Sequence, residues 1–261
     1  MSFLLILIFV LLGLFVGSFL NVCIDRLPRR QSIIAPPSHC PACNQRLGLL
    51  DLIPILSYVW LRGRCRYCRS PIPLRLPLVE GITALLFAFI YTLYGKAGLW
   101  LELGAFLIYA CLLIIIFFID MENQLVLDKV TFPGMAIAFV FSFFLPEPFL
   151  REPGVRSALL GGATGSGIMA LIYFIVFLIF RREGLGFGDV KMAALIGLMV
   201  GFPLVIEALL LSWISGGLVA AILLALKVKG RMDKIPSATF MAVAAMVTLL
   251  WGQAIYNWYL P

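Results

Sequence analysis

The 261-residue chain has little charge: 13% of its residues are Asp, Glu, Lys or Arg, whereas 62% are hydrophobic. A soluble domain carries roughly a quarter charged residues, so this composition excludes an ordinary soluble protein. The mean hydropathy of +1.07 is typical of a chain that crosses the lipid bilayer several times. Because a spanning segment must satisfy its own backbone hydrogen bonds, the sequence predicts an all-α polytopic membrane protein.

The features of a cleavable signal peptide are also missing. The first apolar run, FLLILIFVLLGLFVGSFL, lacks a basic segment before it and a small-residue cleavage site after it. We therefore expect this run to be retained as a membrane span. A helix needs about 20 apolar residues to cross the bilayer. About eight segments are candidates: 3–20, 78–94, 99–119, 130–146, 157–180, 190–202, 204–226 and 238–258.

The positive charges lie almost entirely on one side of these segments. With alternating spans, one side holds the loops 21–77, 120–129, 181–189 and 227–237, which carry most of the Lys and Arg residues. The other side holds Lys96, Arg151 and Arg156. The positive-inside rule places the basic loops in the cytoplasm and both termini outside it. The net charge of +7 then reflects topology and contact with anionic membrane lipid, and no nucleic-acid partner is expected.

One cytoplasmic segment, 24–77, is polar enough to form a small module between the first two spans. It contains two Cys-x2-Cys pairs, Cys40 with Cys43 and Cys65 with Cys68. Four thiolates with this spacing suit a tetrahedral zinc site. Four protein ligands leave no coordination position open for water, so we expect the role of the zinc to be structural. Two disulfides are the alternative, which the reducing cytosol disfavours. The lone histidine, His39, is interpreted as a turn residue rather than a ligand, and Cys23 and Cys111 as packing residues of the spans.

Two aspartates stand at the cytoplasmic ends of different predicted spans. Asp120 ends the apolar run CLLIIIFFID, and Asp189 follows the glycines of GLGFGD. Charge at the membrane is costly and needs an explanation. Two close carboxyl groups share one proton, so the pair can provide the base and the acid for hydrolysis of a peptide bond. Asp189 alone could instead cap a helix, but Asp120, at a helix C-terminus, has no such explanation.

Several neighbours of the two aspartates receive secondary predictions. Gly186 and Gly188 lack Cβ atoms, so a substrate backbone can approach closely. Lys191 either orients Asp189 or anchors its helix at the membrane surface. Asp128 is expected to cap the span that follows it.

Three glutamates fall in or near the predicted spans. Glu80 enters the second span near the cytoplasmic face and is a candidate for a polar or cofactor-binding site. Glu102 and Glu207 lie near the outer face, where we expect both side chains to reach water.

With these residues in place, the chain resembles the type IV prepilin leader peptidases over essentially its full length. The motifs GSFLNVCIDRLPRR, the two cysteine pairs, RLPLVEGITALLF, FFIDMENQLVLDKVTFPG and GLGFGDVKMAALIGLMVG occur in the family's order. That family belongs to the GxGD membrane aspartyl proteases. The resemblance implies a first transmembrane helix at 1–23, a zinc-binding module at 24–77 and a transmembrane aspartyl peptidase domain at 78–261.

The resemblance also implies an activity. Its members remove the short basic leader from prepilins and pseudopilins, which serve type IV pili and protein secretion. They cut after a glycine on the cytoplasmic side of the bacterial inner membrane, and the family's two catalytic aspartates correspond to Asp120 and Asp189. Many members with the cysteine module also methylate the new N-terminus, using S-adenosylmethionine. The sequence contains no Rossmann-type glycine loop that would support methyl transfer independently, so a peptidase without that activity is the alternative.

One motif departs from the family pattern. Ser237, Ala238 and Thr239 replace the Phe-Gly-Pro that commonly precedes the last span. We expect this change to affect substrate contacts or methyl transfer rather than proteolysis.

Two functions of other classes remain as hypotheses. A proton-coupled transporter would place its acidic residues near the bilayer midplane between repeats, and the sequence shows no repeat. A non-catalytic assembly protein would leave the cost of Asp120 unexplained.

Overall fold

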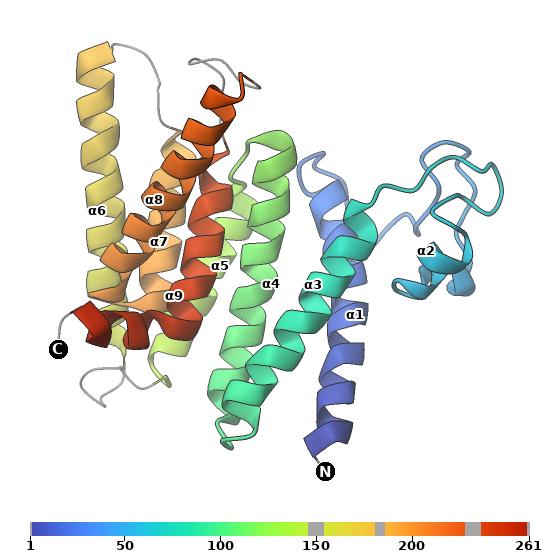
Figure 1. Ribbon diagram of the computed structural model, residues 1–261, viewed down its shortest axis with the longest axis horizontal. Coiled ribbons are helices and arrows are strands. Elements are labelled where there is room, and N and C mark those ends of the chain that lie inside the picture. The colour runs from blue at the N-terminus through green and yellow to red at the C-terminus, as the bar shows by residue number, and fades with distance from the viewer. Residues whose placement is uncertain (1, 146–153, 181–185, 228–235, 260–261) are drawn as a thin grey trace. The chain divides into compact units, whose positions relative to one another are not determined.

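Long apolar segments make this chain helical, because only an α-helix satisfies its backbone within one segment in lipid. The computed structural model describes residues 2–145, 154–180, 186–227 and 236–259 (Figure 1). Within these ranges the regular elements are helices, accompanied by two isolated β-bridges. The chain divides into two compact units, Met1–Ile115 and Ile116–Pro261, and the division falls inside helix α4.

The first unit contains two closely packed helices. Helix α1 spans Ser2–Arg26 and helix α3 spans Arg75–Ile90, which continues as the π-helical turn η2, Tyr91–Gly95. Two glycines of α1 permit the close approach. A Cβ on Gly13 would lie 2.6 Å from the Cα of Ala84, and one on Gly17 would lie 2.7 Å from the Cα of Glu80. Small residues with this four-residue spacing are typical of helix contacts in membranes.

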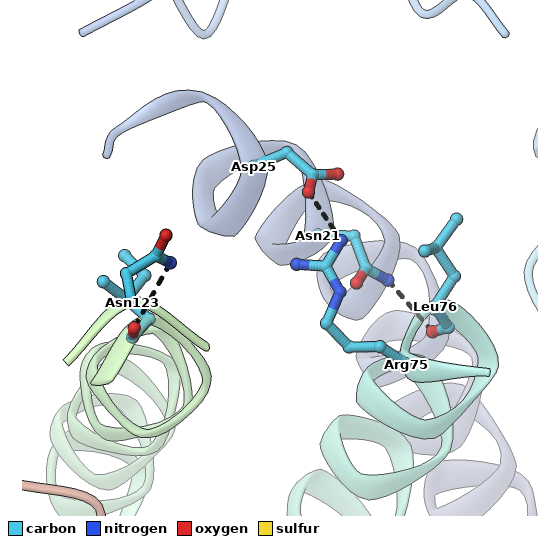
Figure 2. A network of polar contacts seen from close by, with 6 residues as sticks. Asn21, Asp25, Arg75, Leu76 and Asn123 are labelled. Atoms are coloured by element: carbon cyan, nitrogen blue, oxygen red, sulfur yellow. Dashed lines mark hydrogen bonds and ion pairs between the residues drawn. The ribbon is translucent and has the colours of Figure 1, made fainter. Parts of the chain in front are cut away.

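Polar contacts join the same two helices where the chain leaves α1 and enters α3. Arg75 and Asp25 form an ion pair at 2.6 Å, and the Asn21 amide donates to the Leu76 carbonyl at 3.0 Å (Figure 2). The segment between the helices holds a short 3₁₀ turn η1, Leu49–Leu52, and helix α2, Leu56–Trp60.

Helix α4, Trp100–Asn123, carries the chain into the second unit, which is also helical. Helices α6 (Val155–Phe180) and α7 (Phe187–Val200) touch through glycine: a Cβ on Gly161 or on Gly197 would overlap the carbonyl oxygen of the other residue. The C-cap residue of α7 is Gly201, whose φ of +74° favours glycine. The remaining helices are α5 (Asp128–Ser142), α8 (Leu204–Ala225) and α9 (Ser237–Tyr259).

Each of the eight predicted spans overlaps a helix of the structure, but two helices are short. Six helices among the described residues are long and apolar enough to cross a membrane: α1, α3 with η2, α4, α6, α8 and α9. Helices α5 and α7 contain 15 and 14 residues, fewer than the about 20 needed to span the hydrocarbon core. The protein is therefore a multi-pass helical membrane protein with six candidate spans.

Candidate active site

Asp120 lies in the last turn of α4 with only 4% of its surface exposed. Its Oδ2 atom accepts two hydrogen bonds from Thr239 at the start of α9. The Thr239 backbone N–H donates at 2.7 Å and the Thr239 hydroxyl at 3.0 Å. Exposed N–H groups at a helix N-terminus favour a negative charge. The unfavourable position of Asp120 at the end of its own helix is thus offset by the beginning of another helix.

Asp189 is equally buried, at 5% exposure, in the first turn of α7. Its Oδ1 atom is 2.6 Å from the hydroxyl oxygen of Ser237, the first residue of α9. Gly186 is the N-cap residue of α7, so Asp189 occupies the third helical position, where a carboxylate is favourable.

The structure brings the two predicted aspartates to one turn of α9. Ser237 and Thr239 are two positions apart, which separates their Cα atoms by about 5.4 Å in an ideal helix. One residue contacts Asp189 and the other contacts Asp120. Such a pair can hold one proton between two groups, which is the requirement for concerted acid and base catalysis.

The glycines before Asp189 have different surroundings. A Cβ on Gly188 would lie 2.9 Å from the Cβ of Val126, in the loop between α4 and α5, so this glycine is needed for packing. Gly186 is exposed, and a Cβ there would meet no atom of the described residues closer than 3.9 Å. Close approach of a substrate backbone at Gly186 stays a prediction. Gly184 lies outside the described residues.

Lys191 forms an ion pair with Asp128, at 2.6 Å between Nζ and Oδ1. Of the two roles predicted for Lys191, this contact favours anchoring the start of α7 over orienting Asp189. The ammonium group also lies 5.4 Å from the ring centroids of Phe132 and Phe187. Asp128 is the first residue of α5 and makes no capping hydrogen bond, because the N-cap position belongs to Leu127. The expected capping role of Asp128 is therefore wrong.

The four predicted cysteine ligands form a cluster in which all Sγ atoms lie within 4.8 Å of one another. The two Cys-x2-Cys turns have the same backbone pattern. Cys40 N–H donates to the carbonyl five residues later, and Cys65 N–H does the same. A return bond to each cysteine carbonyl comes from Asn44 and Arg69, both with positive φ. The two turns are thus equivalent halves of one site, and none of these cysteines is in a disulfide.

The cluster has the dimensions of a zinc site. Zinc–sulfur bonds of about 2.3 Å at tetrahedral angles separate the sulfur atoms by about 3.8 Å. The Sγ atoms of Cys40 and Cys68 are 3.8 Å apart. Burial alone would raise the pKa of Cys40, but hydrogen bonds from the backbone at Cys43 and Ala42 and from nearby side chains lower the pKa to about 6. A thiolate at neutral pH is the form that binds metal.

Two carboxylates form hydrogen bonds that stabilise the segment around the cysteine cluster. Asp51 accepts hydrogen bonds from Arg66 at 2.7 Å and from the Gly48 N–H at 3.0 Å, which ties η1 to the second cysteine turn. Glu80 of α3 accepts the Ile55 N–H at 2.7 Å. Ile55 has a φ of +58°, a strained value for a β-branched residue, and this hydrogen bond helps to hold it. The Glu80 carboxylate is therefore engaged with the protein backbone.

Sequence reasoning missed three features of these helices. Ser237 and Thr239 contact the aspartates, whereas we expected this departure from the family pattern to bear on substrate or methyl transfer. Hydroxyl residues after a proline at a predicted helix start were the available signal. Glu207 is only 4% exposed, and neither carboxylate oxygen has a hydrogen-bond partner, so the expectation that it reaches water is wrong.

A multi-pass helical membrane protein in which two buried carboxyl groups, from α4 and α7, contact one turn of α9 has the construction of a membrane-embedded aspartyl hydrolase. Comparison with known families agrees with this class. Residues 11–94 match the model of the bacterial Peptidase A24 N-terminal domain, and residues 107–221 match that of the type IV leader peptidase family. The chain belongs to the type IV leader peptidase family, which confirms the resemblance found in its motifs.

Curated relatives extend the match over nearly the whole chain. A prepilin leader peptidase/N-methyltransferase of Aeromonas hydrophila is 34% identical, covering 96% of this chain and 92% of the relative. The protein of the same name from Pseudomonas putida is 32% identical, covering 94% and 90%. That of Myxococcus xanthus (strain DK1622) is 37% identical over 82% of this chain and 61% of the relative. No solved structure matched significantly.

Proposed function

We propose that this protein is a membrane aspartic endopeptidase that removes the basic leader from type IV prepilins or pseudopilins, after a glycine. Family membership and the relatives named prepilin leader peptidase/N-methyltransferase support this substrate class. The observation that carries the catalytic assignment is that the first turn of α9 contacts both Asp120 and Asp189. Contact of both acids with one helix turn is not expected if the two are unrelated surface charges.

We propose that one carboxyl group acts as the base and the other as the acid in hydrolysis. An ionised carboxylate accepts a proton from water as the water attacks the peptide carbonyl, and a protonated carboxyl donates to the developing oxyanion. Burial of both groups strengthens these interactions, because little water screens them.

The contacts of α9 also support an eight-span topology. Asp120 ends α4 and Asp189 begins α7, yet both contact the same turn, so both lie at the same membrane face. An even number of crossings must therefore separate them, and the chain between them consists of α5 and α6. Since α6 is a candidate span, α5 must return the chain to the other face. The same argument applies to α7 and α8 between Asp189 and Ser237. With the basic loops in the cytoplasm, the active site lies at the cytoplasmic face of the inner membrane and both termini lie outside.

The cysteine module is proposed to hold one structural zinc ion through Cys40, Cys43, Cys65 and Cys68. Zinc would supply a fixed tetrahedral link between the two cysteine turns and take no part in hydrolysis. The functional division into 1–23, 24–77 and 78–261 stays a prediction. This division separates parts of the chain by their proposed activity. The division at Ile115 separates two compactly packed units and says nothing about activity.

N-methylation of the new N-terminus with S-adenosylmethionine is the second proposed activity, supported by the names of the relatives. S-adenosylmethionine would supply a methyl group carried on a positively charged sulfonium. The described residues do not offer it an evident site. A cavity of about 690 Å³ beside Trp60 is lined by Arg62, Arg64, Arg66 and Arg69, whose charge is unfavourable for a cation.

We therefore assign no residue to S-adenosylmethionine, and a role for Glu80 in binding it stays a prediction. A peptidase without methyltransferase activity is the alternative. The mass of processed pilin incubated with S-adenosylmethionine decides between them: a gain of one methyl group supports the second activity, and an unchanged mass supports the peptidase alone.

The peptidase assignment is tested with purified Asp120→Asn and Asp189→Asn proteins and a prepilin substrate, read by mass spectrometry. We expect both variants to be folded and inserted but to lose cleavage. Asp128→Asn removes an exposed carboxylate near the same membrane face and is the matched control, which should still cleave. Normal cleavage by either of the first two variants would falsify the catalytic pair.

A further inference from the structure

The first turn of α9 presents two hydroxyl groups to two different carboxyl groups. Ser237 Oγ lies 2.6 Å from Asp189 Oδ1, and Thr239 Oγ1 lies 3.0 Å from Asp120 Oδ2. Asp120 also accepts the Thr239 backbone N–H, whereas the contact between α9 and Asp189 is a side-chain hydroxyl. The contacts therefore distinguish the two aspartates.

Asp120 receives two hydrogen-bond donors on one carboxyl oxygen. The Thr239 backbone N–H can only donate, so the Asp120 oxygen that it contacts at 2.7 Å must accept. The Thr239 hydroxyl reaches the same oxygen. The positive end of the α9 dipole lies at this turn and favours a carboxylate further. Two donors on one oxygen, at a helix N-terminus, favour the ionised form of Asp120.

Asp189 has a partner that can adapt to either protonation state. A serine hydroxyl can donate a hydrogen bond to a carboxylate or accept one from a protonated carboxyl group. At 2.6 Å the contact between Ser237 and Asp189 is short enough to persist in both arrangements. Ser237 therefore keeps Asp189 in place while a proton enters or leaves.

We propose that Ser237 and Thr239 are positioning residues that make the catalytic pair unequal, with Thr239 holding Asp120 as the base and Ser237 holding Asp189 as the proton carrier. This inference rests on the proposed catalytic role of the two aspartates. In the first step Asp120 takes a proton from water as the water oxygen bonds to the peptide carbon. The proton of Asp189 moves to the carbonyl oxygen, which gives a tetrahedral diol.

In the second step the diol breaks down without any further reactant. Asp120 gives its proton to the amide nitrogen as the carbon–nitrogen bond breaks. Asp189 takes a proton from one diol hydroxyl, which becomes the carbonyl of the new carboxyl group. Both aspartates return to their starting states, and one water has been consumed.

The described helices around this pair carry few other ionisable side chains. Glu122 stands after Asp120 on α4, Lys129 is on α5, and Lys191 of α7 is paired with Asp128 of α5. Helices α6 and α8 carry Arg156 and Glu207 near their other ends, and α9 has no Asp, Glu, Lys, Arg or His.

The test measures kcat/KM against pH for prepilin cleavage by the full-length protein in lipid nanodiscs. The acidic limb of such a profile reports ionisation of the base, and the alkaline limb reports loss of the proton from the acid. A hydrogen bond donated to a carboxylate is worth about one pH unit or more. We expect Thr239→Val to move the acidic limb up by about one pH unit. Ser237→Ala is expected to move the alkaline limb up by a smaller amount, because the hydroxyl bonds to both protonation states of Asp189 but more strongly to the charged one.

Conservative and distant variants make the result specific. Thr239→Ser and Ser237→Thr restore a hydroxyl and should return each limb toward its normal position. Thr248→Val is the matched control, because Thr248 lies on the same helix, is 1% exposed, and has a hydroxyl without a partner. It should leave both limbs unchanged.

The outcomes separate this inference from the proposed function. If Asp189→Asn ends cleavage but neither hydroxyl variant moves a limb, the positioning role is wrong while the peptidase assignment stands. If Thr239→Val moves the alkaline limb instead, the roles of the two aspartates are reversed and the inference fails. If Asp189→Asn cleaves normally, the catalytic pair itself is wrong.

Discussion

The cysteine cluster and the aspartate pair are constructed in opposite ways. The cysteines Cys40 and Cys68 are 28 residues apart, and two turns with equivalent backbone hydrogen bonds hold the four thiols. The aspartate pair depends on contacts between residues 48 and 119 positions apart in the chain. The first site is built by local backbone geometry, whereas the second requires three helices to pack correctly.

This difference determines what each site tolerates. A local site depends on its own turns, so a distant change has little effect on it. A non-local site depends on every helix that positions it, so small residues at helix contacts matter as much as the reacting groups. The first expectation is therefore that the two sites fail independently.

Loss of one catalytic carboxyl should have the largest effect. We expect Asp189→Asn to lower prepilin cleavage by at least about 10²-fold, because acid–base catalysis contributes about that much or more. Zinc content should stay at one ion per chain. Cleavage assays and elemental analysis of the same sample measure both quantities. Loss of zinc from Asp189→Asn would contradict the expectation that the two sites are independent.

Removal of one thiol should have a large effect that is the same for either turn. Cys40→Ser and Cys65→Ser each remove one of four ligands, and their backbone surroundings are equivalent. Zinc affinity should fall by more than about 100-fold, beyond the loss that follows removal of an outer-shell partner. Competition with a chelator measures the affinity, and hydrogen exchange within residues 38–72 reports local unfolding. Two clearly unequal losses of affinity would contradict the equivalence of the turns.

A methyl group beside Asp189 should have an intermediate effect. In Gly188→Ala the new Cβ would lie 2.9 Å from the Val126 side chain, so the start of α7 must shift. A misplacement of this kind lowers kcat by about 10- to 100-fold. Val126→Ala in the same protein should restore part of the loss.

Gly186→Ala is the matched substitution, because a Cβ there meets no close neighbour. We expect it to raise KM for prepilin while thermal stability stays unchanged. Equal effects of the two alanine substitutions on stability would contradict the packing role assigned to Gly188.

The exposed ion pair should have the smallest effect. Lys191→Met and Asp128→Asn each remove one partner of a contact whose side chains are 23% and 56% exposed. Surface pairs of this kind contribute about 0–1 kcal/mol, so the change in the free energy of unfolding should stay within about 1 kcal/mol. Thermal unfolding in detergent measures it. A larger loss in Lys191→Met alone would point to its contacts with Phe132 and Phe187.

Hydropathy and residue spacing were sufficient to predict the helices and the local site. Apolar runs located helical segments, because lipid requires each crossing segment to satisfy its own backbone. The Cys-x2-Cys spacing predicted a cluster, because a turn of that length brings both thiols to one side. Neither pattern depends on contacts between distant segments.

Contacts between distant residues could not be predicted from hydropathy or residue spacing. The cost of burying charge singles out Asp120 and Asp189. The hydroxyl residues at the start of the last predicted span indicate a helix start, but not that Ser237 and Thr239 contact the two aspartates. Asp128 was interpreted as a helix cap because capping is a local pattern, whereas its partner Lys191 is 63 residues away. Burial of Glu207 depends on how α8 packs, which composition does not specify.

The glycine contact between α6 and α7 has a mechanical consequence. At Gly161 and Gly197 no side chain separates the two helices. Sliding or rotation of one helix along the other would bring main-chain atoms into steric conflict. Helix α7, which carries Asp189, is therefore held in a fixed position against α6. Any movement that admits a leader peptide must then come from elements other than this pair.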